Sequence, residues 1–168
     1  NSKVKILFYL NAVVHYGQYD ANKDFKEEWA MVKSDGEFYK WRDKYLSYNH
    51  NNDELRQWWI KRALDMMEHD EIDGIFIDAL CKTDRGFLPA RKHGNGWLET
   101  ARQLRERMPE GKLLIGNAIR ARVLKPQFGN WRMMQYLDYL YSYILDHYLF
   151  FQQCSCPPFI NNFHHHGC

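Results

Sequence analysis

The stretch Ile72–Leu80, IDGIFIDAL, decides how the rest of the chain is interpreted. Its large apolar residues are consecutive rather than alternating, which is typical of a strand buried on both faces, as in a parallel α/β sheet. Asp78 stands at or just past the end of this strand. Because α/β folds place ligands and chemistry at the carboxyl ends of their strands, Asp78 is either a catalytic or binding carboxylate or a residue that caps a loop.

The composition of the chain indicates one globular domain. Its 168 residues are 45% hydrophobic and 16% aromatic, which is enough to build a core. A net charge of +2 gives no strong attraction to nucleic acid or to an anionic membrane. No apolar run approaches the roughly 18 to 20 residues of a membrane span. The sequence therefore predicts neither nucleic acid nor membrane as a partner, and it does not determine the oligomeric state.

The two ends of the chain have different characters. The apolar run that begins at Val4 suggests a chain entered in mid-domain, so the compartment is undetermined and a secreted location is possible with an upstream signal. The tail over residues 154–168 holds cysteines and histidines without the paired spacing of a structural zinc site. We therefore predict a domain over residues 1–153, a disordered or non-native tail, and no metal or cofactor.

The first half of the chain predicts a strand, a long loop and a helix. Val4–Val13 is apolar and β-rich, whereas Gly17–His50 is polar, aromatic and without clear period, which indicates a functional loop or short elements. A helix is expected to start after the cap Asn52 and to end near His69. Its buried face is expected to carry the residues that repeat at helical spacing, namely Leu55, Trp59, Ala63 and Met66.

The second half repeats this order. A loop over residues 82–95 follows the Asp78 strand, and a helix with Trp97 and Met108 on its apolar face is expected to stop at Pro109. Leu113–Ala118 is predicted as a short buried strand. Beyond it, Val123–Phe151 is dense in aromatic residues, and its pattern does not separate helix from strand.

The alternation of strands and helices predicts an α/β fold made of right-handed βαβ units. A closed (β/α)8 barrel needs about 250 residues, so a barrel interpretation implies a partial (β/α)8 TIM barrel. A small open α/β sheet is the alternative.

Three predicted strands end in polar residues, namely Asn11, Asp78 and Asn117. If the strands are parallel neighbours, these side chains converge at one rim and offer amides and a carboxylate to a polyhydroxylated ligand. The loops over that rim carry aromatic residues suited to stacking on sugar rings: Tyr16, Trp29, Trp41, Tyr45, Tyr48 and His50. After the Asp78 strand, a basic loop with Arg85 is able to contact an anion or to be simply solvated.

These residues carry a family resemblance. Tyr48–Trp59, YNHNNDELRQWW, followed by Asp73–Asp78, DGIFID, resembles glycoside hydrolases of the TIM-barrel type. Leu7–Asn11 is similar to an earlier barrel strand of that family, and Leu114–Asn117 is similar to a later one. The resemblance covers about two thirds of the chain.

The resemblance implies hydrolysis of O-glycosidic bonds in an oligo- or polysaccharide by a pair of carboxylates, at least in a complete parent protein. Asp78 matches the nucleophile or base. Asp146, in the context Ile144–Tyr148, is the nearest candidate for the second carboxylate, and Asp138 and Asp84 are alternatives. The implied substrate-binding residues are Asn11, Tyr48, His50, Arg85 and Asn117.

Two hypotheses from other classes remain. The chain is alternatively a non-catalytic carbohydrate-binding relic, or an inactive fragment, that keeps the amides and aromatics without the acid. A metal-dependent hydrolase that uses Asp78 with His50 or His93 is disfavoured, because no H-x-H, H-E-x-x-H or D-x-D cluster occurs outside the tail.

Overall fold

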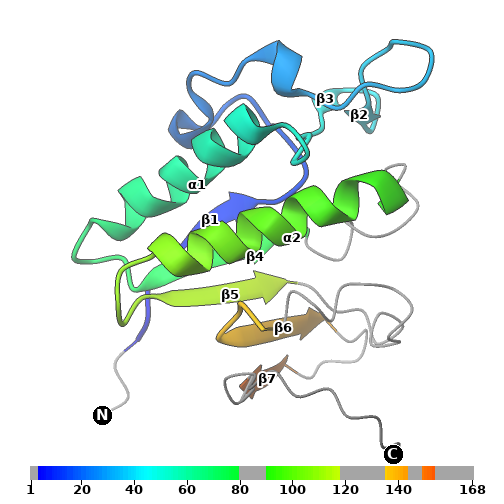
Figure 1. Ribbon diagram of the computed structural model, residues 1–168. Coiled ribbons are helices and arrows are strands. Elements are labelled where there is room, and N and C mark those ends of the chain that lie inside the picture. Colours follow the sequence, from blue (N-terminus) through cyan, green and yellow to red (C-terminus); the bar gives the residue numbers. More distant parts are fainter. Residues whose placement is uncertain (1–3, 80–89, 118–134, 144–148, 154–168) are drawn as a thin grey trace, which may run out of the picture.

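The computed structural model describes residues 4–79, 90–117, 135–143 and 149–153 (Figure 1). Its main sheet has five strands in the order β1-β4-β5-β6-β7. The first four strands run parallel to one another, and β7 is antiparallel to β6. The fold is therefore mixed α/β, and the strands are β1 (Leu7–Asn11), β4 (Gly74–Asp78), β5 (Leu113–Asn117), β6 (Tyr139–Tyr143) and β7 (Leu149–Gln153).

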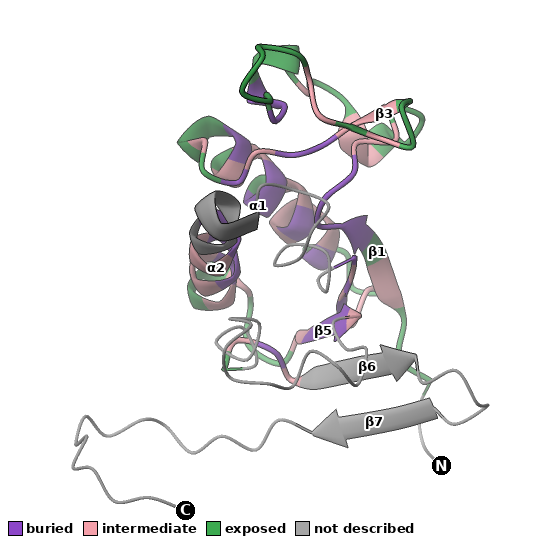
Figure 2. Cartoon of the chain, turned by 90° about the vertical axis from the view of Figure 1, so that its right-hand side faces the viewer, coloured by how far each residue is buried: buried purple, intermediate pink, exposed green. Residues whose placement is uncertain are grey.

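Two helices, α1 (Asp53–Met67) and α2 (Ala90–Arg107), lie side by side on one face of this sheet (Figures 1 and 2). The predicted start of α1 is confirmed, because the Asn52 side chain accepts a hydrogen bond from the Leu55 amide and caps the helix.

The predicted loop over residues 82–95 is too long, because α2 already begins at Ala90. Gly96, which lies within α2, has a packing reason. A Cβ there would lie 2.4 Å from the His50 carbonyl oxygen, so only glycine allows this close approach.

The long segment between β1 and α1 contains short elements, as the sequence predicted. They are the 3₁₀ turns η1 (Asp20–Asn22) and η2 (Glu27–Trp29) and the two-stranded antiparallel sheet of β2 (Lys40–Trp41) and β3 (Tyr45–Leu46). Isolated bridges such as Val14 with Ser47 and Ala30 with Tyr48 tie this segment to itself. It therefore forms an ordered layer beyond the carboxyl end of β1.

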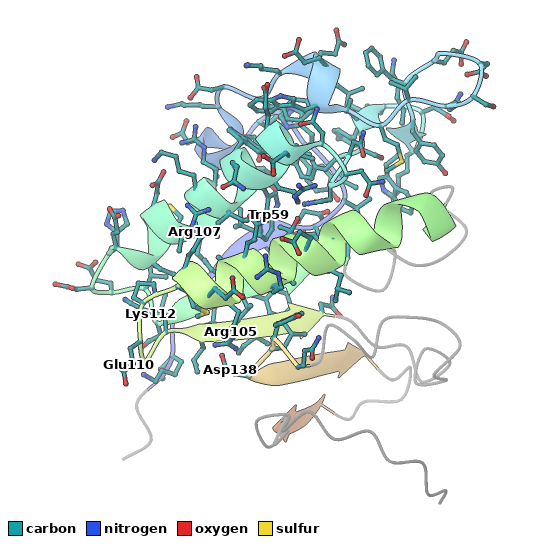
Figure 3. The ribbon with its side chains drawn as sticks, in the orientation of Figure 1. Trp59, Arg105, Arg107, Glu110, Lys112 and Asp138 are labelled. Atoms are coloured by element: carbon teal, nitrogen blue, oxygen red, sulfur yellow. The ribbon has the colours of Figure 1, made fainter. Side chains whose placement is uncertain are left out.

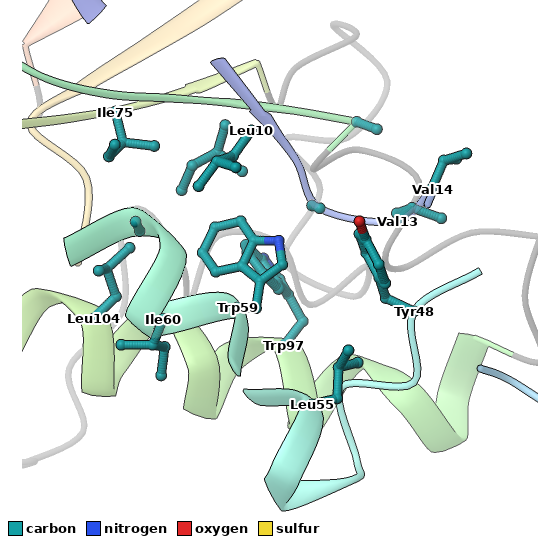
Figure 4. Packing of buried hydrophobic residues seen from close by; sticks show 14 of the residues in the cluster. Leu10, Val13, Val14, Tyr48, Leu55, Trp59, Ile60, Ile75, Trp97 and Leu104 are labelled. Carbon is teal, nitrogen blue, oxygen red and sulfur yellow. The ribbon is translucent and has the colours of Figure 1, made fainter. Parts of the chain in front are cut away.

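The core lies between the sheet and the helices (Figure 4). Trp59 of α1 and Trp97 of α2 meet edge to face, with ring centroids 5.0 Å apart and planes at 90°. Ile75 and Ile77 of β4 point toward these helices and are fully buried. Burying an apolar side chain of this size contributes about 1.5–3 kcal/mol. This side of the sheet therefore anchors the strands.

The other face of β4 is less covered than the sequence predicted. Phe76 and Asp78 are only half-buried, whereas both faces of the strand were expected to be covered. The described helices pack on one face only (Figure 2). Successive residues of β4 therefore differ in exposure.

The last two strands, β6 and β7, do not follow the predicted series of parallel βαβ units. Only five residues, 144–148, connect β6 to β7. A parallel crossover needs a dozen or more residues, so these two strands pair antiparallel. Aromatic residues are common in strands as well as in buried helices, which is why the sequence pattern alone did not assign this region.

Candidate functional site

The site is built on the face of the sheet that points away from the helices. Asn11 at the end of β1 pairs in register with Asp78 at the end of β4. Asn117 at the end of β5 donates a hydrogen bond from its Nδ2 to Oδ1 of Asp78, over 2.7 Å. The prediction that these three strand ends converge is confirmed. They meet at the carboxyl end of the parallel strands, where α/β folds bind ligands.

The Asp78 carboxylate receives one neutral donor on each oxygen. Tyr9 donates its hydroxyl proton to Oδ2 over 2.8 Å, and Asn117 serves Oδ1. Among the described residues, no lysine or arginine forms an ion pair with this carboxylate. The negative charge of Asp78 is therefore oriented by hydrogen bonds without being neutralised.

The side-chain amide of Asn11 contacts the Tyr9 hydroxyl and thereby orients it. Its Oδ1 accepts hydrogen bonds from the backbone amides of Val13 and Val14, over 2.9 and 2.8 Å. This fixes the orientation of the amide, so Nδ2 faces the Tyr9 hydroxyl at 3.1 Å. The side chain is buried, and both of its ends are engaged. Asn11 thus supports the rim from below.

Tyr9 is the residue of this site that the sequence reasoning missed. A tyrosine inside an apolar strand is compatible with a place in the core, so its type alone does not mark it as a site residue. The sequence does contain a signal for it. Side chains alternate between the two faces of a strand, so Tyr9, two residues before Asn11, lies on the same face as Asn11. Partial burial raises the pKa of Tyr9 well above its usual value. The bond from Asn11 opposes this shift, whereas the hydrogen bond to Asp78 and the charge of Asp78 add to it. Burial and Asp78 also raise the pKa of Tyr16.

The chain turns sharply directly after Asp78. Ala79 is buried and has a φ of 63°, in the left-handed region that residues other than glycine rarely occupy. Such a conformation costs roughly 1–2 kcal/mol in an L-residue. Strained residues of this kind cluster at functional sites. The turn ends β4 at the carboxylate.

His50 lies behind the rim rather than on it. It is 4% exposed, and its Nε2 is 2.8 Å from the Ala12 carbonyl oxygen, to which it donates. Its Nδ1 is 3.0 Å from the Thr100 hydroxyl of α2. The sequence predicted an exposed substrate contact here. The ring instead connects the end of β1 to α2, because its two nitrogens contact Ala12 and Thr100, and Thr100 lies 50 positions further along the sequence.

Tyr48 is also buried, at 3% exposure. Its hydroxyl donates to Oδ1 of Asn22 over 3.2 Å, and burial raises its pKa. Both Tyr48 and Tyr9 face a small cavity of about 170 Å³ along β1. No residue of β4 lines this cavity, so Asp78 lies outside it. Its walls are mostly aromatic and include Tyr16, Tyr19, Trp58 and Trp59.

The alternative second carboxylate, Asp138, lies at the opposite end of the sheet (Figure 3). Its Oδ2 accepts hydrogen bonds from Arg105 and from the Leu114 backbone amide, both over 2.8 Å. This ion pair joins β6 to α2 and β5, so Asp138 does not face Asp78. Three predicted residues, Asp84, Arg85 and Asp146, lie outside the described residues.

Within the described ranges, no three histidine, cysteine, aspartate or glutamate side chains gather as metal ligands. Neither helix described here is long and apolar enough to cross a membrane.

The sequence of the chain matches the family model described as hypothetical glycosyl hydrolase family 15 over residues 1–157. The chain belongs to this family. No curated protein sequence matches it.

Two solved structures of glycan-related proteins resemble the fold. An α-galactosidase from Thermus thermophilus, in complex with p-nitrophenyl α-D-galactopyranoside, matches with a TM-score of 0.51 and 14% identity. The match covers 67% of this chain and 23% of that protein. Ega3 from Aspergillus fumigatus, in complex with galactosamine, matches with a TM-score of 0.58 and 15% identity over 82% of this chain and 50% of that one. The chain thus spans half the length of these proteins or less.

Proposed function

We propose that this chain carries the nucleophile or base of a glycoside hydrolase, and that Asp78 is this residue. The observation that supports the proposal is the half-buried Asp78 carboxylate at the carboxyl rim, held by Tyr9 and Asn117 and paired with no described cation. A carboxylate that keeps its charge is suited to attack an anomeric carbon or to take a proton from water. Family membership supports the same chemistry.

The second carboxylate of the pair is proposed to be Asp146. Glycoside hydrolysis requires an acid to protonate the leaving oxygen, at about 5–10 Å from the nucleophile or base. The ion pair of Asp138 with Arg105 favours a structural role for that residue. Asp146, whose sequence context is nearest to the family pattern, is the first candidate, and Asp84 is the alternative. Arg85 is proposed as a further substrate contact.

The proposed ligand is a carbohydrate that lies over the rim. Asn117 is half-buried and carries a carbonyl oxygen besides the Nδ2 that serves Asp78. Tyr16 is near enough to Asp78 for that charge to raise its pKa, and its ring meets Tyr45 edge to face, which provides apolar surface. Galactosides and galactosaminides are the first substrates to test, since the two similar structures contain a galactoside and galactosamine.

We further propose that the sheet is part of a (β/α)8 barrel. In the part of the chain that the structure describes, four neighbouring parallel strands carry helices on one face only, and the site stands at their carboxyl ends. The face with Tyr9, Phe76 and Ile115 would then point to the barrel axis.

The proposal is tested with aryl glycosides that differ in leaving group. A dinitrophenyl α-galactoside and the matching galactosaminide need no acid, whereas a methyl glycoside does. We expect the chain to hydrolyse a dinitrophenyl substrate, and Asp78→Asn to lower kcat/KM on the order of 10³-fold or more. Asp146→Asn should spare the dinitrophenyl substrate and lose the methyl glycoside.

Full activity of Asp78→Asn would contradict the assignment. Binding of the sugar by calorimetry with no turnover of any substrate would favour the binding relic instead. Circular dichroism of each variant serves as the control for folding.

A further inference from the structure

The position of the Tyr9 hydroxyl is set by its contacts with Phe76, Asn11 and Asp78. Its ring lies beside Phe76 of β4, with centroids 6.4 Å apart and planes at 30°. The side chain remains 43% exposed, so it borders the open rim and is not enclosed in the core. The hydroxyl is within hydrogen-bond distance of both Asn11 and Asp78.

The direction of each hydrogen bond in this chain follows from Asn11. Two backbone amides, those of Val13 and Val14, occupy Oδ1 of Asn11. The group that faces Tyr9 is therefore Nδ2, which donates and cannot accept. The Tyr9 oxygen must accept this bond, and its single proton is then directed to Oδ2 of Asp78.

The other oxygen of Asp78 also faces a donor. Asn117 presents an N–H to Oδ1, and this donor cannot accept a proton from a carboxylic acid. A proton on Oδ1 would face the Asn117 donor, and a proton on Oδ2 would require Tyr9 to turn its own proton away. Each oxygen of Asp78 therefore faces a group that donates and leaves no acceptor for a carboxylic acid proton.

We infer that Tyr9 is a positioning residue, which is oriented by Asn11 and holds Asp78 as a carboxylate, so that Asp78 serves as the charged member of the pair and never as its acid. The inference rests on the proposed function in that it assigns a role within the same site. The raised pKa of Tyr9 is consistent with a donor that keeps its proton at every pH of interest.

The first arm of the test is the kinetics of Tyr9→Phe, with Tyr39→Phe as the matched control whose hydroxyl is outside this chain of bonds. Tyr9→Phe removes the donor to Oδ2 of Asp78 and keeps the ring. We expect kcat to fall roughly tenfold with an unchanged KM, on a dinitrophenyl glycoside and on a methyl glycoside alike, and both constants to stay in place in Tyr39→Phe. An unchanged kcat in Tyr9→Phe, or a fall confined to the methyl glycoside, would overturn the inference.

The second arm needs no turnover, so it separates this inference from the proposed function. The tyrosine ring carbons are labelled with ¹³C, and the Tyr9 signal is assigned by its loss in Tyr9→Phe. If the bond exists, the Tyr9 signal titrates at lower pH in Asp78→Asn than in the parent chain. An identical titration in the two proteins would overturn the inference even if the enzyme is active. If the Tyr9 signal differs between the two proteins but no substrate is hydrolysed, the bond is supported and only the proposed function is contradicted.

Discussion

The two ends of the parallel sheet use aspartate in different ways. At the amino end, Asp73 pairs with Lys5 and also accepts the Ile6 amide, and Asp138 pairs with Arg105 and accepts the Leu114 amide. At the carboxyl end, Asp78 faces a phenol and an amide, and no described cation pairs with it.

The two ends therefore differ in what the carboxylate charge is used for: in ion pairs that hold strands together, or in a site that a ligand can reach. An aspartate that joins a cation and a backbone amide links neighbouring strands, and its charge is compensated where it stands. An aspartate held by neutral donors keeps its charge for a ligand. Desolvated or charged side chains in such a position are candidates for function, whereas ion pairs of the first kind are common in any fold.

The largest effect on stability is expected at the amino end. Asp138→Asn removes the charge opposite Arg105 while keeping an oxygen for the Leu114 amide. We predict a loss of about 1–3 kcal/mol in the free energy of unfolding, since hydrogen bonds to charged groups are worth this much and Arg105 is left without its partner. Urea denaturation measures the change.

The matched control is Glu106→Gln, which breaks an exposed ion pair with Arg102 on the same helix. It should change the free energy of unfolding by less than about 0.5 kcal/mol. Equal effects of the two variants would contradict the structural role given to Asp138.

The next effect is expected at the carboxyl rim. Asn117→Ala removes the donor to Oδ1 of Asp78, and we predict a fall in kcat/KM of roughly tenfold, the equivalent of one hydrogen bond to a charged group. Gln103→Ala on the outer side of α2 is the control and should leave the rate unchanged. Unaltered kinetics in Asn117→Ala would mean that this bond does not prepare the carboxylate.

The smallest effect concerns Asp73 and acid pH. The hydrogen bond from Lys5, followed by that from the Ile6 amide, lowers the pKa of Asp73 below its unfolded value. The stabilisation is therefore present above the unfolded pKa of about 3.8 and is lost as the pH falls through the folded pKa. Lys5→Met should make the melting temperature less dependent on pH below about 4. Identical pH slopes in the two proteins would argue against the pair.

Part of this site was accessible from the sequence. The run of apolar residues before Asp78 identified its strand, and the parallel arrangement of strands placed Asn11 and Asn117 beside it. Tyr9 was accessible in principle through its parity with Asn11, but an apolar strand gives a tyrosine an equally good reason to be buried.

Other features depended on contacts between distant residues. His50 meets Thr100 on α2, and Gly96 lets α2 approach the His50 backbone. No local pattern reports such packing, so an exposed rim was expected where a buried link exists. The ion pair of Asp138 with Arg105 likewise joins residues 33 positions apart.

We propose that a carbohydrate binds at the carboxyl ends of the strands, beside Asp78, and not at the amino end of the sheet. The most direct measurement is the ¹⁵N spectrum of the labelled chain during titration with galactosamine and with an α-galactoside. We expect the side-chain amide signal of Asn117 to shift, while the backbone signals of Ile6 and Leu114 at the opposite end stay in place. Shifts at Ile6 and Leu114 with an unmoved Asn117 would contradict it.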